Sequence, residues 1–133
     1  MAAISSYAEK AILDWMLGGA TPTQPGARWA GLAIGTPLSN NNAMSEMGTL
    51  TGYSRLTALF GAAASPTGSA SNTAAMTFGP FSSVGSALGL HIWDGSPVAS
   101  SSALFYGTLQ TARTFGIGDS LVIAAGALTI TLV

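Results

Sequence analysis

Turn-forming residues interrupt this chain at roughly every tenth position from residue 28 onward. Examples are the Gly-Thr-Pro after Ile34, the Asp-Gly-Ser-Pro that begins at Asp94, and the Gly-Ile-Gly-Asp that ends at Asp119. The segments between these turns have the length of β-strands. The pattern does not alternate between strands and helices, which argues against a parallel α/β fold. The spacing therefore predicts an all-β fold over most of the chain.

The predicted strands are short and mix β-branched, aromatic and small residues. They span residues 28–34, 53–60, 74–78, 87–93, 103–110, 121–124 and 127–132, with 111–115 continuing the fifth or forming an edge. The last two form a pair joined through Ala125-Gly126, and the small residues after Phe60 are expected to form a surface loop. About eight strands favour a β-sandwich, with a jelly roll as one economical arrangement. We predict one domain, 1–133, with the sandwich over 27–133.

One helix is predicted near the N-terminus, within residues 1–19. Ser6 and Glu9 have the spacing of a capping box. Apolar residues at helical spacing form one stripe, namely Ala8, Ala11, Ile12, Trp15 and Met16. The Gly18-Gly19 pair predicts the end of the helix, and the prolines that follow prevent its resumption.

The C-terminal stretch LVIAAGALTITLV contains no charged residue. It is too short for a membrane helix, and the alternation of threonine with Ile130 and Leu132 is strand periodicity. The start of the chain lacks a basic leader before an apolar run, so no signal peptide is predicted. We expect no membrane partner. The last strand should pair inside a sheet, with a neighbouring subunit as a natural cover for any open edge.

Charged residues make up 7% of the chain, against about 25% in typical soluble domains. Either much of the surface is buried against partners, or the surface is neutral and rich in hydroxyl groups. Interfaces are depleted in Lys, Glu and Asp, which favours burial against partners. The net charge of −1 provides no field for gathering nucleic acid, so no nucleic-acid partner is expected. The chain has no cysteine, which excludes disulfides and thiolate zinc sites.

The titratable residues do not predict an enzyme. The single histidine, His91, lies three residues before Asp94, and these positions face opposite sides of a strand. We expect His91 to be half-buried, Asp94 and Asp119 to bond their own turns, and Glu46 to be solvated or paired with arginine. No nucleophile elbow or phosphate loop is present. We therefore predict no catalytic residue, no cofactor and no metal site.

Arginine and tryptophan are the remaining candidates for contacts. Each arginine in a predicted strand is expected to have a carboxylate or carbonyl partner, within the chain or in another subunit; these are Arg28, Arg55 and Arg113. The tryptophans are expected to be core or interface anchors rather than platforms for stacking sugars; these are Trp15, Trp29 and Trp93.

The order of these segments resembles a family of small bacteriophage structural proteins, whose members include tail-fibre-like proteins and capsid decoration (cement) proteins. The resemblance covers nearly the whole chain. It rests on "LGGATPTQPGARWAGLAIGTP" after the helix, Glu46 before "GYSRLTALF", then "FGPFSSVGSALGLHIWDG" and the ending "ALFYGTLQTARTFGIGDSLVIAAGALTITLV". None of these stretches is a catalytic motif, so the resemblance is one of overall pattern.

The resemblance implies a virion component, made in the cytoplasm of a host bacterium and located on the capsid surface. Decoration proteins of this kind are β-sandwiches that commonly form homotrimers and bind the major capsid protein. Such a protein stabilises the shell by mass action, because it binds only the assembled form. Two alternatives are a tail or fibre-associated β-sandwich protein of the virion, and a carbohydrate-binding module that uses Trp29 or Trp93.

The N-terminal segment is the favoured place for capsid contacts, because a lone amphipathic helix outside a sandwich must cover something. Its anchors would be Ile4, Tyr7 and Trp15. Equally, the helix can cap its own sandwich or a subunit interface. The full set of candidate capsid or subunit contacts is Ile4, Tyr7, Trp15, Arg28, Trp29, Arg55 and Arg113.

Overall fold

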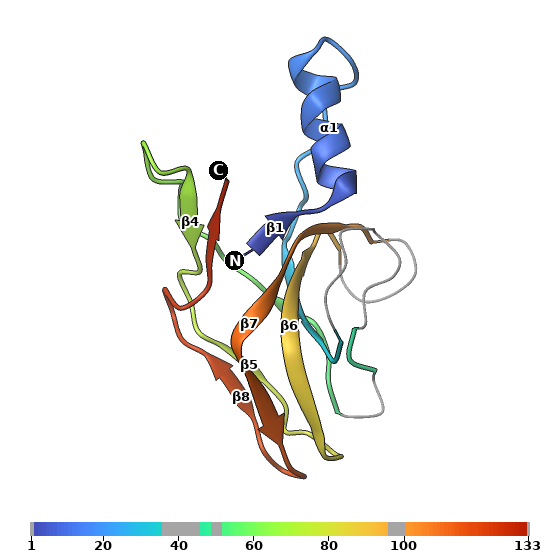
Figure 1. The fold of residues 1–133 in the computed structure, drawn as a ribbon, viewed down its shortest axis with the longest axis vertical. Coiled ribbons are helices and arrows are strands. Elements are labelled where there is room, and N and C mark those ends of the chain that lie inside the picture. The colour runs from blue at the N-terminus through green and yellow to red at the C-terminus, as the bar shows by residue number, and fades with distance from the viewer. Residues whose placement is uncertain (1, 36–45, 49–51, 96–100, 133) are drawn as a thin grey trace.

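The computed structural model describes residues 2–35, 46–48, 52–95 and 101–132, and these form an all-β fold with a single short helix (Figure 1). The helix is α1 (Ser6–Met16). The strands are β1 (Ala2–Ile4), β2 (Trp29–Ala33), β3 (Leu56–Thr57), β4 (Ser69–Ser71), β5 (Met76–Phe78), β6 (Gly85–Trp93), β7 (Ala103–Phe115), β8 (Leu121–Ile123) and β9 (Thr129–Thr131). The predicted fold class is confirmed, and the jelly-roll arrangement stays a prediction.

The main sheet has five strands in the order β1-β7-β6-β2-β3, and every neighbouring pair is antiparallel. Its longest pair is β6 with β7, where Gly85 lies opposite Phe115 and Trp93 opposite Ala103. Residues 111–115 therefore continue β7 rather than forming a separate edge. Only Leu56 and Thr57 of the predicted strand 53–60 join the ladder, while Phe60 forms an isolated bridge to Asn72.

Two further pairs, β4 with β9 and β5 with β8, face the main sheet across the core. The largest fully buried apolar side chains are Leu32, Phe78, Phe81 and Ile92. The last strand pairs as predicted, with Ile130 buried and its neighbour Thr129 exposed. The expectation that the last two strands pair with each other was wrong, because β8 and β9 pair with different strands.

The segment after Phe60, predicted to be a surface loop, contains strand β4, and hydrogen bonds of Asn72 hold this strand in place. This buried side chain donates to the carbonyls of Ala74 and Ala124, at 2.8 and 2.9 Å, and accepts from the N–H of Leu128 at 2.9 Å. The amide thereby fixes the turn between β8 and β9, and with it the register of β9 on β4. Small and polar residues give this loop no strand pattern, so its structure comes from long-range contacts.

Helix α1 begins one residue earlier than the capping box predicted. The N-cap is Ser5, whose hydroxyl accepts from the N–H of Ala8 at 3.2 Å and donates to the carbonyl of Ala103. The buried hydroxyl therefore ties the helix start to β7 as well as capping it. The C-terminal end is as predicted, with Gly18 in the left-handed region at φ +87°.

The first 19 residues also contain a strand that the sequence did not predict. β1 pairs with β7, with Ala2 opposite Gly107 and Ile4 opposite Phe105. Three residues are too few to show strand periodicity, so no sequence signal was available. Helix α1 projects from this strand beyond the sheet (Figure 1), and its main contacts with the sheet run to β7. Among the described residues, no helix has the length and apolar content needed to span a membrane.

Candidate functional site

A cluster of polar and aromatic side chains lies buried where β2, β3 and β6 meet. We call it the buried polar cluster, and its members are Glu46, Tyr53, Arg55, His91 and Trp93. Two of them, His91 and Trp93, lie two residues apart on β6 and so share one face of the sheet. Glu46 forms an isolated bridge with Ala33 at the end of β2. The cluster thus joins β6 to Glu46, Tyr53 and Arg55, which lie much earlier in the sequence.

Arg55 is the centre of the cluster. Its Nε and Nη2 donate to the two carboxylate oxygens of Glu46 at 2.7 and 2.6 Å, and its Nη1 donates to the Gly95 carbonyl at 3.2 Å and the Ser101 hydroxyl at 2.6 Å. The guanidinium carbon lies 3.8 Å from the centre of the Trp93 ring. Such bidentate and stacked contacts suit the planar guanidinium and not a lysine ammonium. The expected partner of Arg55 and the arginine-paired reading of Glu46 are both confirmed.

Tyr53 adds a third donor to the Glu46 carboxylate. Its hydroxyl donates to Oε1 at 2.7 Å and accepts from the N–H of Leu32 at 3.0 Å. Burial raises the pKa of Glu46, but the hydrogen bonds from Arg55 and Tyr53 outweigh this and hold the pKa below its usual value. Burial, together with the Glu46 charge, raises the pKa of Tyr53 well above its usual value. At neutral pH, Glu46 is therefore ionised and Tyr53 is protonated.

His91 is completely buried rather than half-buried as predicted. It packs edge-on against Trp93, with ring centroids 5.7 Å apart, and neither of its ring nitrogens has a hydrogen-bond partner in the described part of the chain. Burial lowers the pKa of His91 to about 4, so the ring is neutral at physiological pH. The sequence could not predict this, because the depth of a strand residue depends on what covers the sheet.

These properties suit the cluster to a structural role. A carboxylate that already accepts three hydrogen bonds is a poor base, and a buried tyrosine with a raised pKa is a poor acid. The two turn aspartates also act structurally, as predicted. Asp94 accepts from the N–H of Ser102 at 2.6 Å, and Asp119 accepts from the N–H of Gly116 at 2.7 Å. In the described ranges, no group of three or more His, Asp or Glu residues is placed to hold a metal ion.

Gly31 on β2 lies opposite His91 and next to the cluster. A Cβ atom there would lie 2.7 Å from the Tyr53 hydroxyl, 2.9 Å from Glu46 Oε1 and 3.0 Å from Trp93 Nε1. We expect Gly31→Ala to lower the free energy of unfolding by about 1–3 kcal/mol, because hydrogen bonds already fix Tyr53 and Glu46. Urea denaturation followed by circular dichroism measures the effect.

The matched control for Gly31→Ala is Gly26→Ala, where an added Cβ would meet no atom within 4 Å. This second substitution should change the free energy of unfolding by less than about 0.5 kcal/mol. Equal stability of the two variants would show that the cluster is not closely packed over β2.

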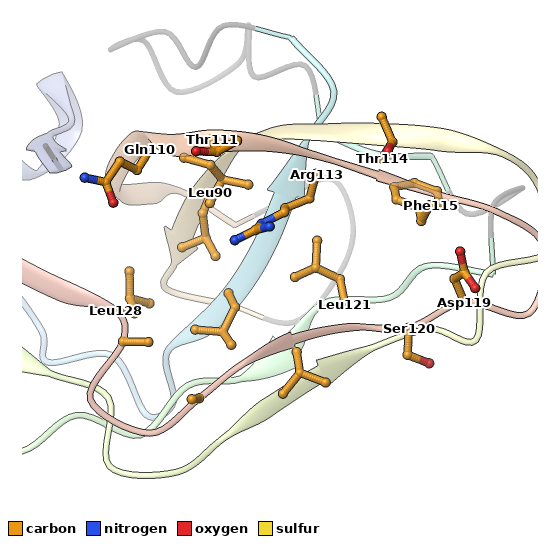
Figure 2. Close-up of a pocket in the computed structure, with 15 residues that line it drawn as sticks. Leu90, Gln110, Thr111, Arg113, Thr114, Phe115, Asp119, Ser120, Leu121 and Leu128 are labelled. Carbon is orange, nitrogen blue, oxygen red and sulfur yellow. The ribbon is translucent and has the colours of Figure 1, made fainter.

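A second feature is a groove between β7 and β8, which diverge from the turn at residues 116–120 (Figure 2). We call it the β7–β8 groove, and it is lined by residues within 109–115 and 119–128 together with Leu90. Its volume is about 670 Å³, within the range of ligand and peptide sites. Leu109, Leu121 and Leu128 supply apolar surface, and Arg113 projects into the space between the strands (Figure 2).

One side of the groove is a free strand edge. On its outer side β7 pairs with β1 only from Phe105 to Gly107, and no described strand pairs there with the rest of β7. The exposed residues beyond that point include Thr111, Arg113 and Thr114. Polar and charged side chains of this kind protect a strand edge from unwanted pairing. The groove is therefore an open, mixed polar and apolar surface.

The structure does not gather the predicted contact residues into one site. Ile4 is partly buried in β1, whereas Tyr7 and Trp15 are exposed on α1, by 44% and 59%. Arg28 and Trp29 are partly buried at the start of β2. Arg55 belongs to the buried polar cluster, and Arg113 is exposed in the β7–β8 groove.

One expectation about these residues needs correction. Among the described residues, Arg28 and Arg113 form no ion pair or side-chain hydrogen bond, so the partners expected within the chain are not found for them. The expectation of a core anchor is confirmed for Trp93, which is 5% exposed and packs against Arg55, with no accessible face left for stacking a sugar. Sequence reasoning also missed Tyr53 and Gly31, which enter the cluster only through strand register.

Comparison with known proteins identifies a family for the chain. The model of a family described as Podophage GP4 fiber I protein gp80 matches residues 3–131. No curated protein matches the chain. The matched region contains α1 and reaches from β1 to β9, including the buried polar cluster and the β7–β8 groove. The chain therefore belongs to the family of the podophage GP4 fiber I protein gp80 and is a bacteriophage virion structural protein.

Proposed function

We propose that the protein is a non-enzymatic, homo-oligomeric component of a bacteriophage fibre. The observation that carries this proposal is the family match, which spans residues 3–131 and whose description names a fibre protein. Among virion locations, this favours a fibre over the capsid surface, which the resemblance first implied. The partners would be other copies of the same chain and a neighbouring virion protein.

The exposed surface supports assembly into a larger structure. Several large apolar side chains are at least half exposed on the separate chain, including Leu13, Met16, Leu17, Val84, Ile117 and Val122. Exposed apolar side chains combined with few charges are typical of surfaces that become buried in assemblies. Repeated copies in a virion would bind cooperatively, because each bound copy raises the effective concentration of contacts for the next.

Gold-labelled antibodies against the protein, applied to intact phage particles and viewed by electron microscopy, test the location. The proposal predicts gold particles on fibres. Label distributed over the head would instead support capsid decoration and contact with the major capsid protein. A third outcome is that the particles carry no label and that mass spectrometry of their proteins does not find this chain. These two results together would contradict both locations. Antibody pre-adsorbed with purified protein serves as the control for non-specific labelling.

A further inference from the structure

Helix α1 has apolar side chains beyond the face that lies toward β7. The inner face, with Ala8 buried and Ile12 partly buried, lies toward β7. Next to this face, and sharing Met16 with the apolar stripe that the sequence predicts, Glu9, Leu13 and Met16 follow the i, i+4, i+7 spacing of an outer stripe. Leu13 is 55% exposed and Met16 is 69% exposed. A surface helix ordinarily has polar residues on its outer face, so this stripe is shaped for a second contact.

The charged side chains indicate which ion pair such a contact could form. The chain has four basic and five acidic residues, and all lie in the described ranges. Lys10 pairs with Asp14, Arg55 pairs with Glu46, and two aspartates bond their own turns. Glu9, Arg28 and Arg113 remain with no ion pair or side-chain hydrogen bond in the described residues. Glu9 is thus the one carboxylate there without such a partner.

The β7–β8 groove complements the outer face of α1 in shape and charge. Its apolar surface, from Leu109, Leu121 and Leu128, can receive the side chains of Leu13 and Met16. The lining also includes Asp119, whose carboxylate already accepts from the Gly116 N–H. Its unpaired cation, Arg113, can receive Glu9. Within one molecule, α1 projects beyond the opposite end of β7 from the groove, so the two surfaces do not meet (Figure 1).

We propose that α1 of one copy docks into the β7–β8 groove of the next copy, with Glu9 paired to Arg113. The inference rests on the self-assembly part of the proposed function and names the two surfaces involved. Because the helix face and the groove are different surfaces, the interface is heterologous, and repeated docking builds a closed ring or an open filament. A closed ring of three would give the homotrimer expected from the sequence.

A charge-reversal cycle tests this interface in the full-length chain. Glu9→Arg and Arg113→Glu each place like charges in contact and should weaken self-association at least tenfold. The double variant, Glu9→Arg with Arg113→Glu, restores opposite charges and should recover most of the wild-type association. Sedimentation velocity over a concentration series measures each constant. Arg28→Glu, at the other unpaired arginine and outside the groove, is the matched control and should associate like the wild type.

The double variant also separates the interface from simpler explanations. If Arg113 only protected the free edge of β7, glutamate would protect it equally well, and Arg113→Glu alone would not weaken association. If Glu9→Arg only weakened the helix, adding Arg113→Glu would not rescue it. Wild-type oligomers that persist in both single variants would overturn the docking proposal while leaving the fibre assignment intact. A wild-type monomer at all concentrations would overturn it as well, and antibody labelling would then decide the location independently.

Discussion

Replacing Arg55 by methionine is expected to lower the free energy of unfolding at neutral pH by about 3–5 kcal/mol. The substitution leaves the Glu46 carboxylate, only 22% exposed, without the two charge-assisted hydrogen bonds that now satisfy it. It also removes the contacts to Gly95, Ser101 and the Trp93 ring. A buried charge without a partner lowers the free energy of unfolding by more than the intact ion pair raises it. We therefore expect the loss of stability to be larger for Arg55→Met than for the other substitutions. Chemical denaturation followed by circular dichroism measures it.

Lys10→Met provides the matched control for Arg55→Met, because it removes the other cation that is paired in the described residues. The Lys10 side chain is 76% exposed and bonds Asp14 one helical turn away. Exposed pairs of this kind contribute little, so the expected loss is below about 0.5 kcal/mol. If the two methionine variants were equally stable, the buried polar cluster would have no special role in holding the fold together.

Acidification is expected to destabilise the protein through His91. The pKa of His91 is about 4 in the folded chain and 6.5 in the unfolded chain, so between these values the unfolded chain binds the extra proton. Stability should therefore fall as the pH is lowered from about 6.5 to about 4, by about 3 kcal/mol in total. Glu46 acts at lower pH, because its folded pKa lies below 4.5 and its stabilising contribution is lost only as the pH falls through that range.

His91→Leu separates the contribution of His91 to the pH dependence of stability from that of Glu46. Leucine does not titrate and has no ring nitrogen that lacks a hydrogen-bond partner. The free energy of unfolding of this variant should be nearly constant between pH 6.5 and pH 4.5, while that of the wild type decreases. Urea titrations at a series of pH values measure both slopes. An unchanged slope in the variant would mean that another group causes the pH dependence.

The spacing of turns was enough to predict most of the β-structure. β2 and β7 lie in the predicted segments, and β6 contains its predicted segment and begins two residues before it. Glycine, proline and aspartate mark the ends of these segments. β1 and β4 were missed, since each has three residues and no alternation. Their positions depend on pairing with β7 and β9, which are far away in the sequence. Short strands of this kind are fixed by tertiary contacts.

The candidate sites could be predicted only in part. The pairing of Glu46 with an arginine was one of two readings open from the sequence, since so few charges are available. The position of Gly31 beneath Tyr53 follows from the register that places Gly31 opposite His91, which the sequence does not encode locally. The β7–β8 groove depends on two consecutive strands diverging instead of pairing, and the Gly116–Asp119 turn alone does not distinguish these outcomes.

Light scattering of the purified full-length chain over a range of dilutions tests most directly the central claim that the protein is built to assemble with itself. We predict a mass of three copies of the 13.3 kDa chain that persists to submicromolar concentration. This result would explain the scarcity of charge, the exposed stripe on α1 and the open β7–β8 groove together. A single-chain mass at every concentration would contradict self-assembly and leave these surfaces for a different virion protein.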